Sequence, residues 1–168
     1  MFSRPSERQF EQTVRAYSAD LYRYAYWLCH DRFVAEDLVQ QTFERAWKHW
    51  RDLHDMACVK SWLITILRRE HARLYQRMRL DTVDDDPETL DLPSCVQADS
   101  QLELEQMVEA LPLAYREPLL LQTLGGYSCT EIAAMLGTSV GAVMTRLTRA
   151  RHALRAHLAA LEQTRIPK

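Results

Sequence analysis

Long apolar runs are missing from this 168-residue sequence, and glycine is scarce, with only 4 residues. No segment approaches the roughly 20 consecutive apolar residues that cross a membrane as a helix. Residues 1–12 contain no apolar stretch like that of a signal peptide. Alternating apolar and polar residues, the pattern of half-buried strands, are also rare. We therefore expect a cytoplasmic, all-α protein that does not insert into a membrane.

The four cysteines, Cys29, Cys58, Cys95 and Cys129, lie far apart and form no C-x-x-C pair, so a structural zinc site has little support. A metal site that uses Cys29 and His30, and a redox role for Cys58 or Cys95 in predicted loops, stay open as alternatives. The sequence offers no recognisable nucleophile–base pair, phosphate-binding loop or metal-ligand cluster. We expect no cofactor and no enzymatic activity of the chain's own.

Charge is unevenly distributed along the chain, although the formal net charge is only −2. Residues 1–80 contain 14 Lys and Arg against 10 Asp and Glu. Residues 81–109 contain 10 acidic residues and no basic one, and residues 110–168 contain 7 basic residues against 3 acidic ones. Two basic blocks are therefore joined by a strongly acidic strip. Blocks of charge, more than net charge, indicate binding surfaces.

The acidic strip also lacks helix signals. Pro87 and Pro93 interrupt any helical periodicity within residues 81–100, and the like charges repel one another. We predict a flexible linker over these residues. It is either a solubilising tether or a mimic of DNA that occupies a basic channel, and the sequence favours neither.

Apolar residues recur at helical spacing on both sides of the predicted linker. The predicted helices cover residues 7–29, 33–50 and 57–79 before the linker and residues 102–111 and 112–124 after it. Pro118 is expected to kink the last of these or to delay its start. The pattern predicts two small helical domains, residues 1–80 and residues 101–168.

Residues 126–158 predict two helices around a tight turn. Ser128 and Glu131 have the spacing of a capping box at the start of the first helix, and Gly137 stands where that helix ends. The two residues after Gly137, a Thr and a Ser, are favoured N-caps for the second helix. Because a helix-turn-helix inserts its second helix into the major groove, this stretch predicts sequence-specific DNA binding.

The second helix of this unit has two different faces. At about 100° per residue, its apolar face carries Val143, Leu147, Ala150, Leu154 and Leu158. Its opposite face carries Gly141, Thr145, Thr148, Arg149 and His152, flanked by Arg146, Arg151 and Arg155. Slim residues let a helix approach base edges, and Thr and Arg can contact bases or phosphates. The alternative is a solvated basic face on an ordinary helical hairpin.

Three segments carry a resemblance to a known family. They are FVAEDLVQQTFERAWKHWRDL, VKSWLITILRREHARLYQR and LPLAYREPLLLQTLGGYSCTEIAAMLGTSVGAVMTRLTRARHAL. In this order they resemble the extracytoplasmic-function (ECF) sigma factors of bacterial RNA polymerase, in the sigma-70 family. The resemblance extends from about Phe10 to Leu158. It implies a three-helix sigma region 2 in residues 1–80 and a helix-turn-helix sigma region 4 in residues 101–168.

The resemblance also implies partners and a division of labour. Region 2 would bind the β′ and β subunits of core RNA polymerase and would read and melt the minus-ten element of promoter DNA. Region 4 would read the minus-thirty-five element. A cognate anti-sigma factor would hold the protein inactive.

Residues are assigned to each surface by the same resemblance. Core polymerase binding falls on Glu36, Asp37, Leu38, Gln40, Gln41, Phe43 and Glu44, although Leu38 and Phe43 could equally belong to the core. Minus-ten contacts fall on Lys60, Trp62, Arg68, Arg69, Arg73 and Arg77. Minus-thirty-five contacts fall on Ser139, Gly141, Met144, Thr145, Arg146, Thr148, Arg149 and His152.

Some positions depart from the family pattern or allow two interpretations. Many relatives have Arg-Asn where this chain has Arg68 followed by a second arginine, and a lysine where it has Met144, which puts promoter preference in doubt. Trp47, Trp50 and Trp62 could stack on a melted base, although core filling is favoured for Trp47 and Trp62. The rival functions are a conventional DNA-binding regulator, an interaction protein that titrates a regulator, and an enzyme that uses Cys29 and His30 or Cys58.

Overall fold

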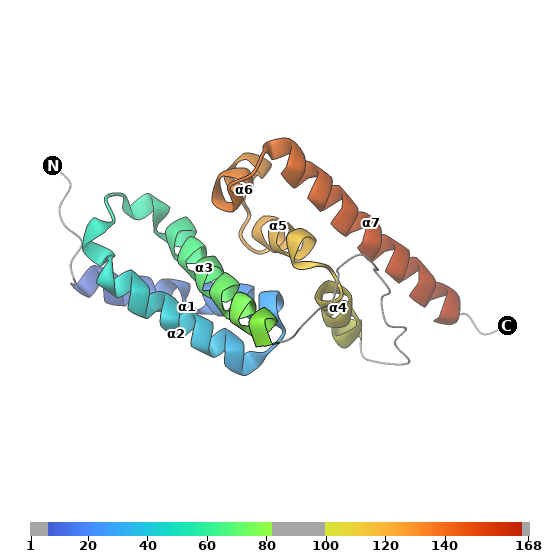
Figure 1. Ribbon diagram of the computed structural model, residues 1–168, viewed down its shortest axis with the longest axis horizontal. Coiled ribbons are helices and arrows are strands. Elements are labelled where there is room, and N and C mark those ends of the chain that lie inside the picture. The colour runs from blue at the N-terminus through green and yellow to red at the C-terminus, as the bar shows by residue number, and fades with distance from the viewer. Residues whose placement is uncertain (1–6, 82–99, 166–168) are drawn as a thin grey trace. The chain divides into compact units, whose positions relative to one another are not determined.

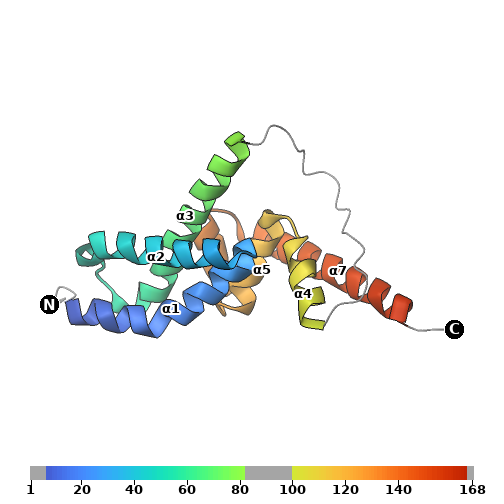
Figure 2. The same cartoon turned by 90° about the horizontal axis from the view of Figure 1, so that it is seen from below.

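The computed structural model describes residues 7–81 and 100–165, and every regular element within those ranges is helical. The all-α prediction is confirmed. Among the described helices, none combines the length and the apolarity that a bilayer crossing requires. The predicted linker of residues 81–100 lies almost entirely outside the described residues. The chain divides into two compact units, Met1–Asp85 and Asp86–Lys168, which are described separately (Figures 1 and 2).

In its described residues, 7–81, unit 1 is a bundle of three α-helices with two short 3-10 turns before the third. The elements are α1 (Glu7–Cys29), α2 (Arg32–Lys48), η1 (Trp50–Asp52), η2 (Met56–Cys58) and α3 (Val59–Asp81). His30 has a left-handed φ of 52° between the first two helices. Asp31 then caps α2, because its carboxylate accepts a hydrogen bond from the backbone N–H of Val34 at 3.0 Å. As a result α1 and α2 lie side by side, and α3 packs against both (Figures 1 and 2).

All three helices contribute to the core of unit 1. Its large, fully buried side chains include Leu21, Tyr24, Leu28, Leu38, Leu63 and Leu67. Near the start of α1, the ring of Phe10 lies 4.9 Å from that of Trp47 and 5.0 Å from that of Trp50. Trp50 is buried, whereas Trp47 is 48% exposed. Core filling by Trp47 is therefore wrong: it lies at the edge of this cluster, and Trp50 fills the interior.

The described residues of unit 2, 100–165, form four helices. They are α4 (Ser100–Glu109), α5 (Leu113–Thr123), α6 (Cys129–Leu136) and α7 (Val140–Arg165). The core includes Leu111, Leu121, Ile132, Val143, Leu147 and Ala150. Three of the five residues predicted for the apolar face of α7 are thus buried, and Leu154 is half-buried. Leu158 is 49% exposed, so its assignment to the core is wrong, because the last turns of α7 extend beyond α5 and α6 (Figure 1).

The turn between α4 and α5 is held by one side chain. Arg116 donates from Nη2 to the carbonyl oxygen of Leu111 at 3.0 Å and also contacts the carbonyl oxygen of Glu109. A guanidinium group is a suitable donor at this place, because the last four carbonyl groups of a helix have no donor within the helix. Pro118 lies inside α5, which begins at Leu113. The proline therefore does not delay the start of this helix.

The predicted helix-turn-helix is confirmed in its details. Ser128 and Glu131 form a reciprocal capping box: the Glu131 N–H donates to Ser128 Oγ at 3.3 Å, and the Ser128 N–H donates to Glu131 Oε2 at 2.8 Å. Gly137 ends α6 with a φ of 63°, a conformation that glycine adopts without strain. Ser139 then caps α7 by accepting a hydrogen bond from the N–H of Ala142 at 3.2 Å. The capping box thus defines the start of α6, and Gly137 and Ser139 define the turn between α6 and α7.

Candidate nucleic-acid interface

The outer face of α7 carries the side chains that the sequence assigns to base recognition. Gly141, Met144, Thr145, Thr148, Arg149 and His152 are exposed, and Arg146 is half-buried. The hydroxyls of Thr145 and Thr148 each donate to the backbone carbonyl four residues earlier, at 2.9 Å. Their methyl groups and the Met144 side chain therefore make this part of the face slim and largely apolar. Such a surface can contact thymine methyl groups in the major groove.

Two arginines of α7 are held by α5. Arg149 donates from Nη1 to the hydroxyl of Tyr115 at 3.2 Å, and Arg151 donates to the side-chain oxygen of Gln122. Both arginines remain exposed. Their guanidinium groups are thus steered by a neighbouring helix, which lowers the entropy lost when they bind a base or a phosphate. Sequence periodicity alone did not indicate either contact.

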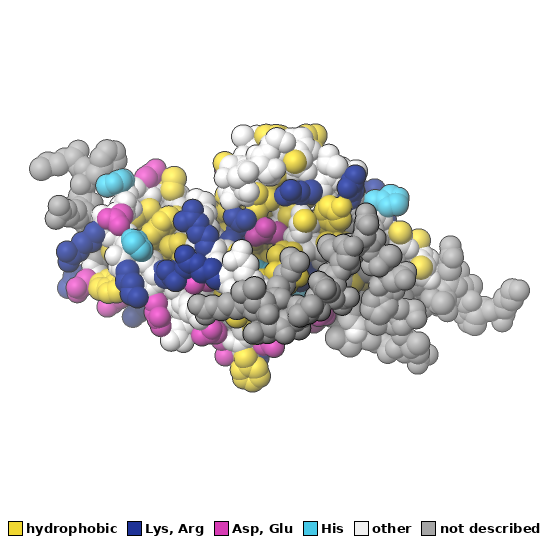
Figure 3. Space-filling view, in the orientation of Figure 1, with side chains coloured by type: hydrophobic (Ala, Val, Ile, Leu, Met, Phe, Trp, Pro, Cys, Tyr) yellow, Lys and Arg dark blue, Asp and Glu magenta, His cyan; other side chains and the backbone are white. Residues whose placement is uncertain are grey.

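The exposed side of α3 is basic. Arg69 and Arg73 are exposed and Arg68 is half-buried, and Figure 3 shows Lys and Arg side chains gathered over this helix. Arg73 is not isolated, because it pairs with Glu70 at 2.9 Å. The side chain of Arg77 lies outside the described residues. Arginines along one helix can neutralise successive phosphates, which is the sequence-independent part of DNA affinity.

Two other predicted minus-ten residues lie nearer the start of α3. The ammonium group of Lys60 pairs with Asp20 of α1 at 3.1 Å. Trp62 is half-buried, and its ring lies 6.2 Å from that of Trp50. Both side chains are therefore tied to the bundle, which places them beside the loop that joins α2 and α3. Partial burial of Trp62 agrees with the core role favoured for it.

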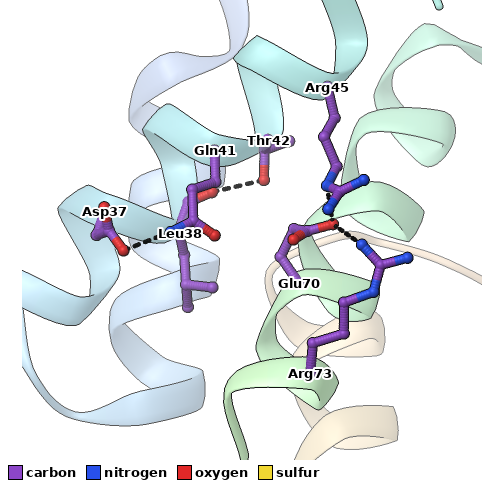
Figure 4. Close-up of polar contacts among 7 residues, drawn as sticks. All are labelled: Asp37, Leu38, Gln41, Thr42, Arg45, Glu70 and Arg73. Carbon is purple, nitrogen blue, oxygen red and sulfur yellow. Dashed lines mark hydrogen bonds and ion pairs between the residues drawn. The ribbon is translucent and has the colours of Figure 1, made fainter.

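The exposed side of α2 has the opposite character. Glu36, Asp37, Gln40 and Glu44 are exposed, and Gln41 is half-buried. Gln41 donates to Asp37 Oδ2 at 2.6 Å (Figure 4), and Gln40 donates to Glu44 Oε1 at 3.1 Å. These pairs at i and i+4 hold the polar side chains in rows along the helix. The resulting surface, here called the acidic stripe, is suited to a basic protein partner.

The two apolar residues assigned to polymerase binding lie inside the bundle or at its edge. Leu38 is fully buried between α2 and its neighbours. Phe43 is half-buried, and its ring contacts that of Phe10 at 6.4 Å. Leu38 thus belongs to the core, which settles the ambiguity left by the sequence.

Two family models match the two units. Residues 13–79 match the sigma-70 region 2 model, and residues 101–154 match the sigma-70 region 4 model. The ECF RNA polymerase sigma factor SigL of Mycobacterium tuberculosis is 32% identical over 156 residues, which cover 89% of this chain and 88% of SigL. The chain belongs to the ECF sigma factors.

Further similarities agree with that assignment. SigE of Mycolicibacterium smegmatis, another ECF sigma factor, is 30% identical over 159 residues, which cover 89% of this chain but only 62% of SigE. A solved structure of the sigma factor RpoE in complex with the anti-sigma factor NepR, from Bartonella quintana, is similar with a TM-score of 0.74 and 28% identity. The alignment covers 90% of this ECF sigma factor and 98% of RpoE.

Region 2 of this ECF sigma factor contains a cluster that sequence reasoning missed. Glu70 is buried and pairs with both Arg73 and Arg45, which come from α3 and α2 (Figure 4). A signal for it exists in the sequence. Glu70 falls between Leu63, Leu67 and Leu74 at core spacing, and a charged residue at such a position is almost never buried without a partner.

The loop before α3 places a cysteine beside a carboxylate. Cys58 is exposed, and its thiol lies 3.6 Å from Asp55 Oδ2. The negative charge of Asp55 raises the pKa of the Cys58 thiol, and its weak hydrogen bond to the carboxylate adds to this. In the described parts of the chain, no three His, Cys, Asp or Glu side chains gather as metal ligands. The alternative metal site at Cys29 and His30 therefore gains no support, and Cys95 lies outside the described residues.

Proposed function

We propose that this ECF sigma factor binds core RNA polymerase and directs it to a subset of promoters. Unit 1 carries two surfaces of opposite charge: the acidic stripe on α2 and the arginines of α3. This juxtaposition is the observation that carries the proposal. A basic protein surface and a DNA phosphate backbone are the two partners that these charges fit, and a conventional regulator would need only the second.

The division of labour follows from the two units. The acidic stripe binds the β′ subunit, with β as a further contact, while α3 and the loop before it bind and open the minus-ten element. The outer face of α7 reads the minus-thirty-five element in the major groove. The polymerase performs the chemistry, so that the sigma factor needs no catalytic group of its own and acts in the cytoplasm with the polymerase.

An anti-sigma factor is the regulator that we propose. The similar RpoE structure is a complex with the anti-sigma factor NepR, and this chain covers nearly all of RpoE. A protein that covers the acidic stripe or the arginines of α3 would block polymerase or DNA. Such occlusion would keep the factor silent until a signal releases it.

In vitro transcription tests the proposal. Purified core polymerase would be combined with the full chain on the region upstream of this protein's own gene. Transcripts that require the chain, and that fall when Arg149 is replaced by Ala while core binding is unchanged, would support the proposal. A footprint on duplex DNA without polymerase, and no transcript with it, would instead indicate a conventional regulator. If neither a transcript nor a footprint is obtained, the interpretation that remains is a protein that only titrates a partner.

A further inference from the structure

Glu70 on α3 contacts arginines from two helices, and its side chain is only 7% exposed (Figure 4). Its Oε1 lies 2.9 Å from Nη1 of Arg73, three residues further along α3, and also pairs with Nε of Arg45 on α2. A buried carboxylate needs such partners, because burial of an isolated charge is strongly unfavourable. Arg45, Glu70 and Arg73, here called the Arg–Glu–Arg cluster, together carry one net positive charge.

Both arginines keep donors for another partner. A guanidinium group presents five N–H donors in a planar fork, and Glu70 engages one nitrogen of each arginine. The side chains of Arg45 and Arg73 are 47% and 52% exposed. Two forks that are anchored at one carboxylate oxygen and are half-exposed suit an anion with several oxygens, and phosphate is the anion that such forks fit.

The cluster lies beside the other arginines of α3. Arg69 is exposed and precedes Arg73 by four residues, which places the two about one turn apart on the same side of the helix. Arg45 adds a cation from α2 to this row. Figure 4 shows Arg45 reaching towards α3, while Asp37 and Gln41 hydrogen-bond to each other nearer the start of α2. The helix α2 therefore carries the acidic stripe and also adds one cation, Arg45, to the basic row of α3.

We propose that Arg45 and Arg73, oriented by Glu70, form a two-guanidinium clamp for a backbone phosphate of promoter DNA. The inference rests on the proposed function and assigns a DNA contact to α2. Glu70 acts as a positioning residue: it touches the arginines and not the DNA. By fixing both forks before DNA arrives, it reduces the side-chain entropy that is lost on binding.

A purely structural role for the cluster makes a different prediction. A buried ion pair contributes little net stability compared with apolar residues of the same size. In a purely structural role, the Arg–Glu–Arg cluster would only link α2 to α3. In that case, replacing Arg45 would change stability and leave the salt dependence of DNA binding unaltered. The number of phosphates that a protein neutralises sets that salt dependence, since each contact releases condensed counterions.

Holoenzyme assembled from purified core polymerase and the full chain provides the test. The affinity for a labelled fragment of the promoter found by transcription would be measured over a series of salt concentrations. Arg45→Ala is expected to lower the slope of log affinity against log salt by about 0.7 to 0.9 and to weaken binding equally on different promoter sequences. Arg15→Ala removes an exposed arginine from α1 and is the control, with the slope of the wild type.

Two further variants separate orientation from charge. Arg45→Lys keeps the charge but loses the fork, so we expect weaker binding with a slope close to that of the wild type. Glu70→Gln removes a negative charge beside the proposed phosphate. If only charge mattered, this variant would bind DNA more tightly. If Glu70 orients Arg45 and Arg73, the variant binds DNA more weakly. Weaker binding with normal core binding supports the positioning role, and stronger binding overturns it.

The outcomes distinguish failure of the phosphate clamp from failure of the proposed sigma factor function. If the wild-type holoenzyme forms no specific promoter complex, the proposed function fails and the clamp fails with it. If that complex forms and Arg45→Ala has the slope and affinity of Arg15→Ala, only the clamp is overturned. Arg45→Ala leaves the pair between Glu70 and Arg73 in place, so a folded protein is expected, and circular dichroism checks it.

Discussion

The hydroxyl oxygen of Tyr115 lies 3.2 Å from Nη1 of Arg149, so that α5 holds an arginine on the recognition face of α7. Tyr115→Phe removes this hydrogen bond and little else. We expect transcription that depends on the minus-thirty-five element to fall roughly two- to tenfold, the range that one hydrogen bond contributes. Core polymerase binding should be unchanged. Full activity of Tyr115→Phe would show that Arg149 needs no orientation from α5.

The acidic stripe can be tested by reversing its charge. Asp37→Arg combined with Gln41→Arg replaces a hydrogen-bonded pair by two cations, and we expect binding to core polymerase to be lost. Glu11→Arg combined with Gln12→Arg makes the same change in charge at two exposed positions of α1 and should bind normally. A pull-down with purified core polymerase measures both. Equal binding by the two double variants would contradict the assignment of the stripe.

Local signals in the sequence predicted the elements well, because each depends on residues close together in the chain. The first helix was expected over residues 7–29 and spans Glu7–Cys29. The capping box of Ser128 with Glu131 and the left-handed Gly137 were also predicted and are present. Capping and turn formation are set within a few residues, so one sequence is enough to recognise them.

Contacts between helices were harder to predict. Periodicity gives the face on which a residue lies but not how far along a helix its neighbours cover that face. Trp47 is therefore expected in the core but is 48% exposed, and Leu158 shares a face with the buried Leu147 but is 49% exposed. The pairs of Arg45 with Glu70 and of Arg149 with Tyr115 join residues 25 and 34 positions apart. Such long-range contacts depend on how the helices pack.

The capping box makes a separate prediction for stability. Ser128→Ala removes the side-chain acceptor at the start of α6, and we expect a loss of about 1 kcal/mol in the stability of this unit. All four tryptophans lie in residues 1–81, so tryptophan fluorescence does not report on it. The stability of unit 2 is instead measured by amide hydrogen exchange within α6, resolved by peptide. Faster exchange confined to unit 2 is the expected result, and unchanged exchange would contradict the role of the cap.

Glu131 gives this stability a pH dependence. Hydrogen bonds from the backbone and the hydroxyl of Ser128 lower the pKa of Glu131 below its ordinary value of 4.5. The stabilisation is therefore present above pH 4.5 and is lost as the pH falls through the lowered pKa. Glu131→Gln should be less stable than wild type at pH 6. This difference in stability, the gap, should narrow as the pH falls below 4.5. Far-UV circular dichroism melts over that range measure the gap, and a constant gap would argue against the titration of Glu131.

Cys58 provides a prediction about reactivity in the loop before α3. Asp55 raises the pKa of this thiol, and only the thiolate is nucleophilic, so the thiol should react slowly at neutral pH although it is exposed. Asp55→Asn removes the charge and keeps an acceptor for the N–H of Ala57, which Asp55 binds at 2.9 Å. We expect alkylation of Cys58 by iodoacetamide, followed by peptide mass spectrometry, to be faster in this variant and its midpoint to move to lower pH.

Asp52→Asn is the matched control for this experiment, because Asp52 lies in the same loop but contacts His49 at 3.3 Å. It removes the same charge without touching the thiol and should leave alkylation close to the wild-type rate. Equal acceleration by both variants would mean that the net charge of the loop, and not the contact with Asp55, controls Cys58. Acceleration by Asp55→Asn alone would mean that the carboxylate keeps the thiol protonated, which argues against a redox switch at this cysteine while Asp55 remains ionised.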